Sequence, residues 1–461
     1  MKKQKIYLLS PKELSPEVIA VTFAKTSRSP LSFNEIADEL SDESSAEFHE
    51  KWVVGYGHAS VAEHAVLHIA IENVSRMAIE CIESNRLASY TEKSTRYQKW
   101  DSDAVVTPPE LIGDPRQEIY EETVKMLFQT YADSLLPTRA IIQKKNPRKG
   151  NESDAAWDRR IRAKYVDACR FLLPAASLAN VGMTANARVL ESAIRKMLSH
   201  PLQEVRQIGE EIKKVAQAEV PTLVKYADAS PYLRNFSQYA IGKTKNTSST
   251  SSSCQLIDFD PAAENKILSA AFYRFGESSF ANSLAYIQNL SKAKRAQLAE
   301  KLLGGMSRFD IPLREFEYSH YTFDLIMDQG AYFEFKRHRM MTQSPQNLTV
   351  NLGYATPSLL AEAGFESRYI AAMDAAAEAY HQIGDPHLAA YLVPNGFNRR
   401  VLASFNLREA YHFCQLRAAK NAHFSIRKIA RQIYAEISKY HPLLAKYMRL
   451  PAEETWQQHL K

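Results

Sequence analysis

The stretch SNRLASYTEKSTRYQ at residues 84–98 returns in altered form as RHRMMTQSPQN at residues 337–347. Each copy begins with a three-residue group that ends in arginine, and eight positions after that arginine stands Ser94 in the first copy and Asn347 in the second. The first copy keeps the serine but has Ser-Asn-Arg as its triplet, whereas the second has a complete Arg-His-Arg triplet but lacks the serine. A motif that occurs twice with complementary losses predicts a duplicated domain whose copies have divided the functional residues between them.

The sequence around the two motifs has the same order of predicted elements. Residues 65–74, AVLHIAIENV, alternate as a half-buried strand does, and residues 321–330, YTFDLIMDQG, occupy the matching place. A short helical pattern follows each strand and leads into the motif triplet. A proline and an asparagine twelve residues apart come later in each half, and each half then has a long helical pattern. These further matches are Pro174 with Asn186, Pro394 with Asn406, and the predicted helices at residues 203–217 and 425–441.

One low-complexity segment, KTKNTSSTSSSC at residues 243–254, lies between the two motifs. A run of serine and threonine buries little apolar surface, so we expect a linker or a flexible surface loop. The alternative is a long loop inside a single domain, which compact domains rarely contain. We therefore predict a first domain at residues 1–240, a linker at 241–258 and a second domain at 259–461. Each domain is expected to be of the α+β class, with a twisted, mainly antiparallel sheet packed against long helices.

Length and composition narrow the class of protein. With 461 residues the chain is long enough for two domains, and its content of 45% hydrophobic and 24% charged residues is ordinary for a globular protein. No apolar run approaches the roughly 20 residues of a membrane span, and none has the length of a secretory signal, so we expect a cytoplasmic protein. The net charge of +6 is mild, and no basic tail or stripe points to nucleic acid. The four cysteines are scattered without a metal-binding pattern, so we predict no metal site.

The residues of both copies resemble the flavin-dependent thymidylate synthases. The signature of that family is an Arg-His-Arg triplet followed by seven residues and a serine, within a segment of the form RHRxASxNExSxRY. Residues 85–97 read NRLASYTEKSTRY and follow GHASVAEH at residues 57–64, which is similar to the family's GHxSxxEH element. Residues 337–347 supply the triplet, and both halves later carry a proline and an Asn-x-Arg group similar to the family's C-terminal pattern. Together these matches span most of the chain.

The resemblance implies a reductive methylation of deoxyuridylate (dUMP) to thymidylate (dTMP). Reduced FAD would supply a hydride, methylenetetrahydrofolate the carbon, and NADPH the electrons that reload the flavin. The family uses no cysteine nucleophile, in agreement with the scattered cysteines of this chain. Its members are homotetramers that build each active site across subunits. The resemblance therefore implies one composite site made by both halves, and a homodimer of this chain in place of the tetramer.

Nucleotide-binding residues are implied in both halves. The segment EKSTR at residues 92–96 matches positions that hold the nucleotide in the family, and so does Arg170, which shortly precedes Pro174. Guanidinium forks and hydroxyl donors suit a phosphate group. In the second half the matching positions read Pro345, Asn347, Thr349 and Ala390, so that copy has lost these residues. The implied residues of the first half are Glu92, Lys93, Ser94, Thr95, Arg96 and Arg170, and the second half adds Glu334 and Arg337.

The implied catalytic residue is Arg417, which matches the family arginine placed against the pyrimidine ring. A fixed positive charge there would stabilise the negative charge that develops on the ring. The first half has lost its own copies of this arginine and its neighbours, so we expect the reciprocal site to be inactive. The degenerate counterparts in the first half are Cys81, Ser84, and either Lys196 or Met197.

A second set of residues matches flavin-contacting positions of the family. Hydrogen-bond donors and cations around an isoalloxazine ring tune its reactivity. The triplet and the helix after Asn406 supply most of this set, and the GHASVAEH element supplies the rest. The implied cofactor-binding residues are His58, Ser60, Arg337, His338, Arg339, Asn406, Arg408 and His412.

Each assignment also has a purely structural interpretation. The Arg-His-Arg triplet is also typical of a solvated cationic cluster at a helix C-terminus, and EKSTR of an edge strand. Asn186 and Asn406 also fit helix N-caps, and His58 and His64 also fit core histidines. Only the ordered occurrence of all these features favours an enzyme.

Two other functions fit the same residues. The losses in both copies are also consistent with a catalytically lapsed protein that binds flavin or nucleotide as a regulator or scaffold. The retained EKSTR segment is also consistent with a flavin enzyme that modifies C5 of another pyrimidine nucleotide.

Overall fold

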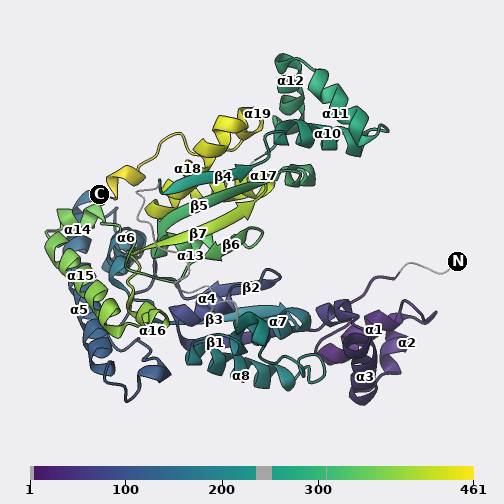
Figure 1. Ribbon diagram of the computed structural model, residues 1–461, viewed down its shortest axis with the longest axis horizontal. Helices are drawn as coiled ribbons and strands as arrows, with labels where there is room; N and C mark the ends of the chain where they lie inside the picture. The colour runs from purple at the N-terminus through teal and green to yellow at the C-terminus, as the bar shows by residue number, and fades with distance from the viewer. Residues whose placement is uncertain (1–4, 235–251, 308, 461) are drawn as a thin grey trace. The chain divides into compact units, whose positions relative to one another are not determined.

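The structure is a computed structural model that describes residues 5–234, 252–307 and 309–460 (Figure 1). The described chain forms two compact units, each a mixture of helices and antiparallel sheet, which confirms the predicted α+β class. The units are interleaved along the sequence. The first contains the described parts of Met1–Ser94, Asp103–Gln117 and Ala176–Thr247, and the second contains Thr95–Ser102, Glu118–Ala175 and the described parts of Ser248–Lys461.

The first unit is built on a three-stranded antiparallel sheet in which β3 (Leu178–Asn186) lies between β1 (Val66–Ser75) and β2 (Ala88–Glu92). Exposed and buried residues alternate along most of β1, as the sequence predicts for a half-buried strand. The last residue of β3, Asn186, accepts a hydrogen bond from the first turn of α7 (Ala187–Leu198) and caps it. The sheet therefore leads directly into a helix with a defined start.

Helices connect and cover this sheet. α4 (Arg76–Ile82) follows β1 without a loop, and the hydroxyl of Ser75 accepts from the backbone N–H of Ala78 to cap it. α8 (Gln203–Gln217) packs against α7 and α4, and its start matches the start of the predicted helix. The remaining helices of this unit are α1 (Pro16–Lys25), α2 (Phe33–Asp38), α3 (Asp42–Phe48), η1 (His49–Gly55), η2 (Ala59–His64) and η3 (Pro109–Leu111).

The second unit is built on a four-stranded antiparallel sheet in the order β4-β5-β7-β6. Buried residues alternate with partly exposed ones along β5 and β7, and one cluster of buried side chains joins these strands to α17 and α18. This cluster is the core of the unit. The strands are β4 (Cys254–Phe259), β5 (Tyr321–Asp328), β6 (Thr342–Pro345) and β7 (Asn398–Phe405), and the two core helices are α17 (Leu407–Arg417) and α18 (Phe424–Tyr440).

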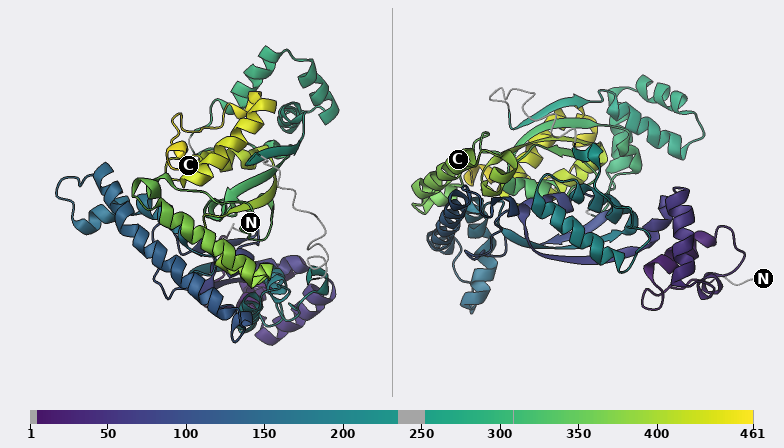
Figure 2. Two further views of the ribbon diagram at one scale, coloured as in Figure 1. Left: turned by 60° about the vertical axis from the view of Figure 1, so that its left-hand side comes forward. Right: turned by 60° about the horizontal axis from the view of Figure 1, so that its bottom comes forward.

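Long helices from both halves of the sequence pack within the second unit. α5 (Gln117–Lys145) and α15 (Glu366–Ile383) lie side by side (Figure 2), and Arg368 of α15 forms an ion pair with Asp133 of α5. The other helices of this unit are α6 (Asp154–Cys169), η4 (Arg170–Leu172), α10 (Ala263–Phe275), α11 (Phe280–Asn289), α12 (Lys292–Leu303), η5 (Arg314–Glu317), α13 (Gln329–Phe335), α14 (Ser358–Glu362), α16 (Pro386–Ala389), η6 (Ala390–Leu392), α19 (Pro442–Ala445) and η7 (Trp456–Gln458).

The two sheets repeat one topology. β1, α4, β2, β3, α7 and α8 follow one another in the first unit as β5, α13, β6, β7, α17 and α18 do in the second. The strand orders β1-β3-β2 and β5-β7-β6 are the same, and β4 is an additional edge strand. Asn186 and Asn406 occupy equivalent places, because Asn186 ends β3, Asn406 directly follows β7, and each caps the next helix. The predicted duplication is confirmed in the fold.

The equivalent prolines of the two halves meet inside the second unit. Pro174 and Pro394 are partners in an isolated antiparallel bridge. The backbone N–H of Ala175 donates to the carbonyl of Val393 at 3.1 Å, and that of Asn395 donates to the carbonyl of Leu173 at 3.0 Å. These reciprocal bonds hold the end of η4 beside the segment that leads into β7.

The predicted linker at 241–258 is wrong at its C-terminal end. Residues 235–251 lie outside the described residues, but Cys254–Phe259 form β4 and pair with β5. The alternation of CQLIDF is sufficient for a strand once β5 offers a free edge, and the preceding Ser/Thr run obscured it. The predicted domain boundaries at 240 and 259 stay a prediction about the repeat. The compact units divide the chain differently, because Glu118–Ala175 of the first half joins the second unit.

None of the helices within the described residues has both the length and the apolar character that crossing a membrane requires.

Candidate functional site

Glu334 stands at the centre of a cluster of charged residues in the second unit. It lies in α13, whose N-terminus is capped by Asp328, and its side chain is 9% exposed. Its Oε2 accepts from Nη1 of Arg417 at 3.0 Å, and its Oε1 lies 3.5 Å from Nη1 of Arg96. One carboxylate thus bridges an arginine from the first half of the sequence and an arginine from the second.

Arg96 is held on its other side by Asp167. The guanidinium makes two parallel bonds, from Nε to Oδ1 at 2.9 Å and from Nη2 to Oδ2 at 2.8 Å, and Nη1 also donates to the carbonyl of Asn421 at 3.0 Å. Burial alone would lower the pKa of Arg96, but the hydrogen bonds that it donates to Asp167 raise it, so the guanidinium stays charged. Asp167 was not predicted as a site residue.

Arg170 is buried, and within the described residues its hydrogen-bond partners are neutral groups. Its Nη1 donates to the hydroxyl of Thr95 and its Nη2 to the carbonyl of Gly330, both at 3.1 Å. Within the part of the chain that the structure describes, its Nε has no hydrogen-bond partner. Burial lowers the pKa of Arg170, the charge of Asp167 opposes this shift, and the charge of Arg96 adds to it. A buried cation in this state favours an anion nearby.

Gly330 allows Arg170 to reach this place. A Cβ added at residue 330 would lie 3.0 Å from Oδ1 of Asp328, 3.1 Å from the ring of Phe171 and 3.2 Å from Nη2 of Arg170. Such contacts are tighter than ordinary van der Waals packing, so a side chain at this position would push the guanidinium away. The short helix α13 therefore needs a glycine where the two halves of the sequence meet.

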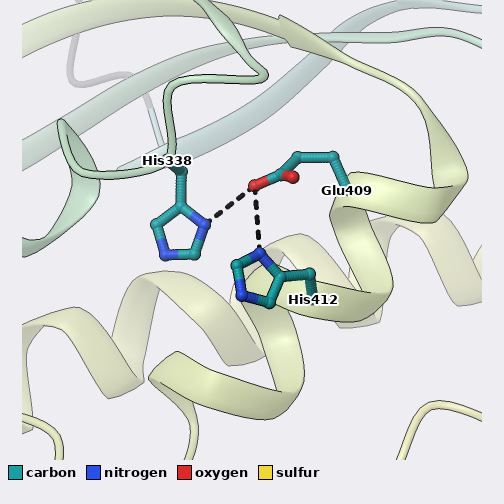
Figure 3. Close-up of side chains that lie close together, drawn as sticks. All are labelled: His338, Glu409 and His412. Carbon is teal, nitrogen blue, oxygen red and sulfur yellow. Dashed lines mark hydrogen bonds and ion pairs between the residues drawn. The ribbon is translucent and has the colours of Figure 1, made fainter. Parts of the chain in front are cut away.

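His338 connects Arg417 to Glu409. Nε of Arg417 donates to Nε2 of His338 at 3.0 Å, and because an arginine only donates, this nitrogen must be an acceptor. The proton of the neutral ring is then on Nδ1, which donates to Oε1 of Glu409 at 2.8 Å (Figure 3). Nδ1 of His412 lies 3.7 Å from the same oxygen. Arg417 is thus held at two of its nitrogens, by Glu334 and by His338.

The protonation states agree with this arrangement. Burial lowers the pKa of His338, so the ring is neutral near pH 7. Burial would raise the pKa of Glu409, but the hydrogen bonds from His338 and His412 lower it to about 2. Glu409 is therefore an ionised carboxylate in a nearly buried place, with two imidazole rings beside it.

Of the predicted nucleotide residues, Thr95, Arg96, Arg170 and Glu334 come together with Arg417 in the second unit. Arg337 is exposed, and its predicted role stays a prediction. The other predicted nucleotide residues are Glu92, Lys93 and Ser94, which belong to the first unit. There Arg76 forms an ion pair with Glu92 and donates to the backbone carbonyl of Lys93.

The predicted flavin residues are divided in the same way. His58 and Ser60 belong to the first unit, where His58 precedes η2 and its ring lies 6.1 Å from that of Trp52. Asn406 uses its side-chain oxygen to cap α17, which confirms the capping interpretation. Arg408 donates to the carbonyl of Pro312 and to Glu317. Arg339 is half-buried and His412 is exposed beside the buried His338. The flavin roles of all these residues stay predictions.

Sequence reasoning missed two carboxylates of the cluster. Asp167 lies three positions before Arg170 on the last turn of α6, where an acid reads as part of a solvated helix face. Glu409 lies three positions after Asn406, where an acid reads as a capping-box residue. Only burial distinguishes them, since Asp167 is 7% and Glu409 8% exposed.

The first unit contains the degenerate copy of this cluster, which shows the interactions that the substituted residues can no longer make. Nζ of Lys196 donates to the hydroxyl of Ser84 at 2.7 Å, and Cys81 stands at the position that Glu334 has in the other copy. Burial lowers the pKa of Lys196 and raises that of the nearby Cys81 to about 11. This copy therefore has one weakened point charge and no carboxylate bridge.

Comparison with known proteins agrees with the repeat. The family model described as thymidylate synthase complementing protein matches residues 9–222 and again 255–443. A flavin-dependent thymidylate synthase of Clostridium tetani is 29% identical over 218 residues, which are 47% of this chain and 84% of that protein. About half of this chain thus corresponds to most of that relative, as a tandem duplication predicts.

Other relatives match nearly the whole chain. A UPF0159 protein of Chlamydia muridarum is 29% identical over 89% of this chain and 82% of its own length. A UPF0159 protein of Chlamydia pneumoniae is 28% identical over 94% of this chain and 90% of its own length. Among solved structures, one described as the UMP/dUMP methylase PolB from Streptomyces cacaoi bound with 5-Br dUMP covers 42% of this chain and 93% of its own, with 17% identity and a TM-score of 0.33.

Proposed function

Because the chain belongs to the thymidylate synthase complementing protein family, we propose that it is an FAD-dependent enzyme that reductively methylates dUMP to dTMP. Methylenetetrahydrofolate would supply the carbon and NADPH the reducing electrons. The family and the flavin-dependent relatives support an enzyme of the thymidylate-synthase or nucleotide-methylase type in general. The particular substrate and the folate donor are part of the proposal.

One observation carries the proposal: arginines from both halves of the sequence converge on Glu334 inside one unit. Arg96 and Arg170 match nucleotide-holding positions of the family, and Arg417 matches the pyrimidine-facing position. Two of these three guanidinium groups are paired with the carboxylates of Asp167 and Glu334, and the three together offer the donors that an anionic nucleotide requires.

Arg417 would act on the pyrimidine. Its Nε and Nη1 are engaged by His338 and Glu334, whereas its Nη2 makes no hydrogen bond with any other described residue. A guanidinium that is held at two nitrogens is preorganised, and its remaining donors are free for a ligand. Negative charge that develops on the uracil ring would be stabilised there without reorganisation of the protein.

The surroundings of His338 fit a flavin. The exposed Arg337 and the half-buried Arg339 flank His338 in the sequence, and the ring of the exposed His412 lies 5.1 Å from that of His338. Such groups suit the diphosphate and the electron-rich reduced ring of FAD, whose chemistry when bound is hydride transfer. The residues of the chain would bind this cofactor and orient it.

The proposal includes the assembly. The cluster forms from residues of a single chain, so one site does not need a second subunit for its arginines. We expect a homodimer whose four related sheets imitate the family tetramer, and size-exclusion chromatography with light scattering would measure it.

The absorbance spectrum of the purified protein tests the function. A yellow protein whose visible flavin bands change on addition of dUMP, and which forms dTMP from dUMP, methylenetetrahydrofolate and NADPH, is the expected result. A colourless protein that takes up no added FAD would contradict the proposal.

A catalytically lapsed nucleotide or flavin binder is the second candidate. It is favoured by the engagement of Arg96, whose three guanidinium nitrogens each have a partner in Asp167 or the carbonyl of Asn421. Complementation of a thymidine auxotroph separates the two, since a scaffold should not restore growth. Turnover of another pyrimidine nucleotide, but not of dUMP, would indicate a relative with a different substrate.

A further inference from the structure

Three side chains around His338 have the composition of a transition-metal site. One ring nitrogen of His338, a carboxylate oxygen of Glu409 and one ring nitrogen of His412 all lie within 4.8 Å of one another (Figure 3). Within the described residues, this is the only group of three or more histidine, cysteine or acidic side chains so close together. Two imidazoles and one carboxylate are the ligand set of many zinc enzymes and of non-haem iron(II) sites.

The positions of these three side chains in the fold restrict how far they can move. Glu409 and His412 are three residues apart on α17, so they lie on the same face of that helix. The backbone N–H of Glu409 donates to the cap residue Asn406, which fixes the first turn. His338 is 3% exposed and follows α13, so only His412, whose side chain is 56% exposed, is free to turn.

The distances need only a small closure. Nδ1 of His338 lies 2.8 Å and Nδ1 of His412 3.7 Å from Oε1 of Glu409. Metal–ligand bonds of 2.0–2.2 Å at tetrahedral angles place neighbouring ligand atoms roughly 3.3 Å apart. A turn of the exposed His412 ring and a shift of a few tenths of an ångström between the other two would reach that geometry.

Metal binding to His338 would break its hydrogen bond with Arg417. A metal ion on Nδ1 of His338 needs that nitrogen without its proton, so the neutral ring must carry the proton on Nε2 instead. Nε2 now accepts from Nε of Arg417, and two N–H groups would then face each other across 3.0 Å. The proton lost from Nδ1 to water is regained at Nε2, so no net proton is released, but the bond to Arg417 is lost.

We infer that His338, Glu409 and His412 form a site for a divalent transition-metal ion such as Zn²⁺, and that its occupation releases Arg417 from His338. The metal ion and the arginine compete for opposite sides of one imidazole ring. This inference concerns binding and tautomer only, and it stands or falls independently of the proposed reaction.

Calorimetric titration with Zn²⁺ tests the site. We expect one equivalent to bind to the wild-type protein. Glu409→Gln and His412→Ala should each weaken the affinity more than about 100-fold, since even outer-shell partners of a metal ligand contribute 10- to 100-fold. His320→Ala is the matched control, because His320 and Asp258 form an exposed histidine–carboxylate pair at 3.1 Å without a third ligand.

Nitrogen-15 spectra of the histidine side chains test the competition. The proton of His338 should be on Nδ1 without metal and on Nε2 at saturating Zn²⁺, and the shift should reverse with a chelator. The inference is overturned if His412→Ala binds Zn²⁺ as tightly as the wild type. It is equally overturned if His338 keeps its Nδ1 proton at saturation. Because His412 is exposed, its variant should fold even if Glu409→Gln does not.

Discussion

Glu334 and Arg417 are joined by a 3.0 Å bond between Oε2 and Nη1, and the carboxylate that makes this bond also faces Arg96. Arg96 and Glu334 are more than 200 residues apart in the sequence, so the cluster joins distant segments of the chain. A ligand that enters this cluster therefore meets guanidinium groups whose directions are already set by carboxylates.

Replacement of Arg417 should affect turnover more than substrate binding. Arg417→Ala removes the charge that would stabilise the developing anion on the ring, and loss of one such donor typically costs about 10²- to 10³-fold in kcat. Arg417→Lys should recover only part of this loss, because a lysine cannot bond Glu334 and His338 in the same fork geometry. Steady-state kinetics of dTMP formation measures both variants.

Lys196→Ala is the internal control for Arg417. Lys196 precedes Met197, which lies as far from the cap residue Asn186 as Arg417 lies from Asn406, and it bonds Ser84 instead of a carboxylate. We expect unchanged turnover in this variant. A large loss would mean that the degenerate copy also takes part in the reaction.

Glu334→Gln should destabilise the protein, because it leaves two arginines facing a neutral amide. Arg96 and Arg417 are 15% and 14% exposed, so water compensates only in part, and we expect a loss of about 2 to 3 kcal/mol in the free energy of unfolding. Urea denaturation monitored by fluorescence measures it.

Glu317→Gln provides the comparison for Glu334. Glu317 also faces two arginines, Arg408 at 3.0 Å and Arg314 at 3.6 Å, but its side chain is 29% exposed. Its loss should cost no more than about 1 kcal/mol. Equal costs for the two substitutions would show that the bridge of Glu334 has no special role in stability.

The repeat made a large part of the fold and the site predictable. Residues with a periodic pattern, such as 65–74 and 203–217, form the expected strand and helix, because amphipathic periodicity records burial directly. The pairing of Arg96 with the cluster around Arg417 was predictable from the complementary losses together with the resemblance to the family. That information is in the order of motifs and does not require coordinates.

Packing partners were not predictable in the same way. α6 belongs to the first half of the sequence but packs in the second unit, where it supplies Asp167 to Arg96. A helical pattern predicts which face is buried but not against which neighbour. Glu409 is a similar case, because its local sequence is that of a helix start and its role depends on His338, 71 residues away.

Gly330→Ala should weaken nucleotide binding without removing a functional group. The added methyl group would meet Nη2 of Arg170 at 3.2 Å and the ring of Phe171 at 3.1 Å, so the guanidinium must move. Overpacking of this kind costs about 1 to 3 kcal/mol in stability, and part of that cost should appear as a weaker Kd for dUMP in calorimetry.

Gly305→Ala is the matched control for Gly330. A Cβ at residue 305 meets nothing within 4 Å, so neither stability nor nucleotide affinity should fall. If both alanine variants bind dUMP equally well, the close approach of Gly330 to Arg170 has no bearing on the ligand.

His423 should make the protein less stable in acid. The ring is buried, its Nδ1 accepts from the N–H of Ser425 at 3.3 Å, and Nε2 then donates to the carbonyl of Asp167 at 3.2 Å. Burial lowers the pKa of His423 far below its usual value, and the charges of Arg170 and Arg96 lower it further. Above about pH 6.5 the ring is neutral in both the folded and the unfolded chain, so stability there does not depend on its titration. Below that pH the ring binds a proton in the unfolded chain but stays neutral in the folded protein. The free energy of unfolding therefore falls by up to about 1.4 kcal/mol per pH unit for this one group.

His423→Gln tests this assignment by removing the titration while keeping an N–H that can donate to Asp167. Free energies of unfolding measured between pH 7.5 and pH 5 should decline less steeply for the variant than for the wild type, with the difference appearing only below about pH 6.5. His320→Gln, at an exposed histidine, should retain the wild-type slope. Parallel curves for His423→Gln and the wild type would mean that the acid sensitivity arises elsewhere, for instance at the buried His441.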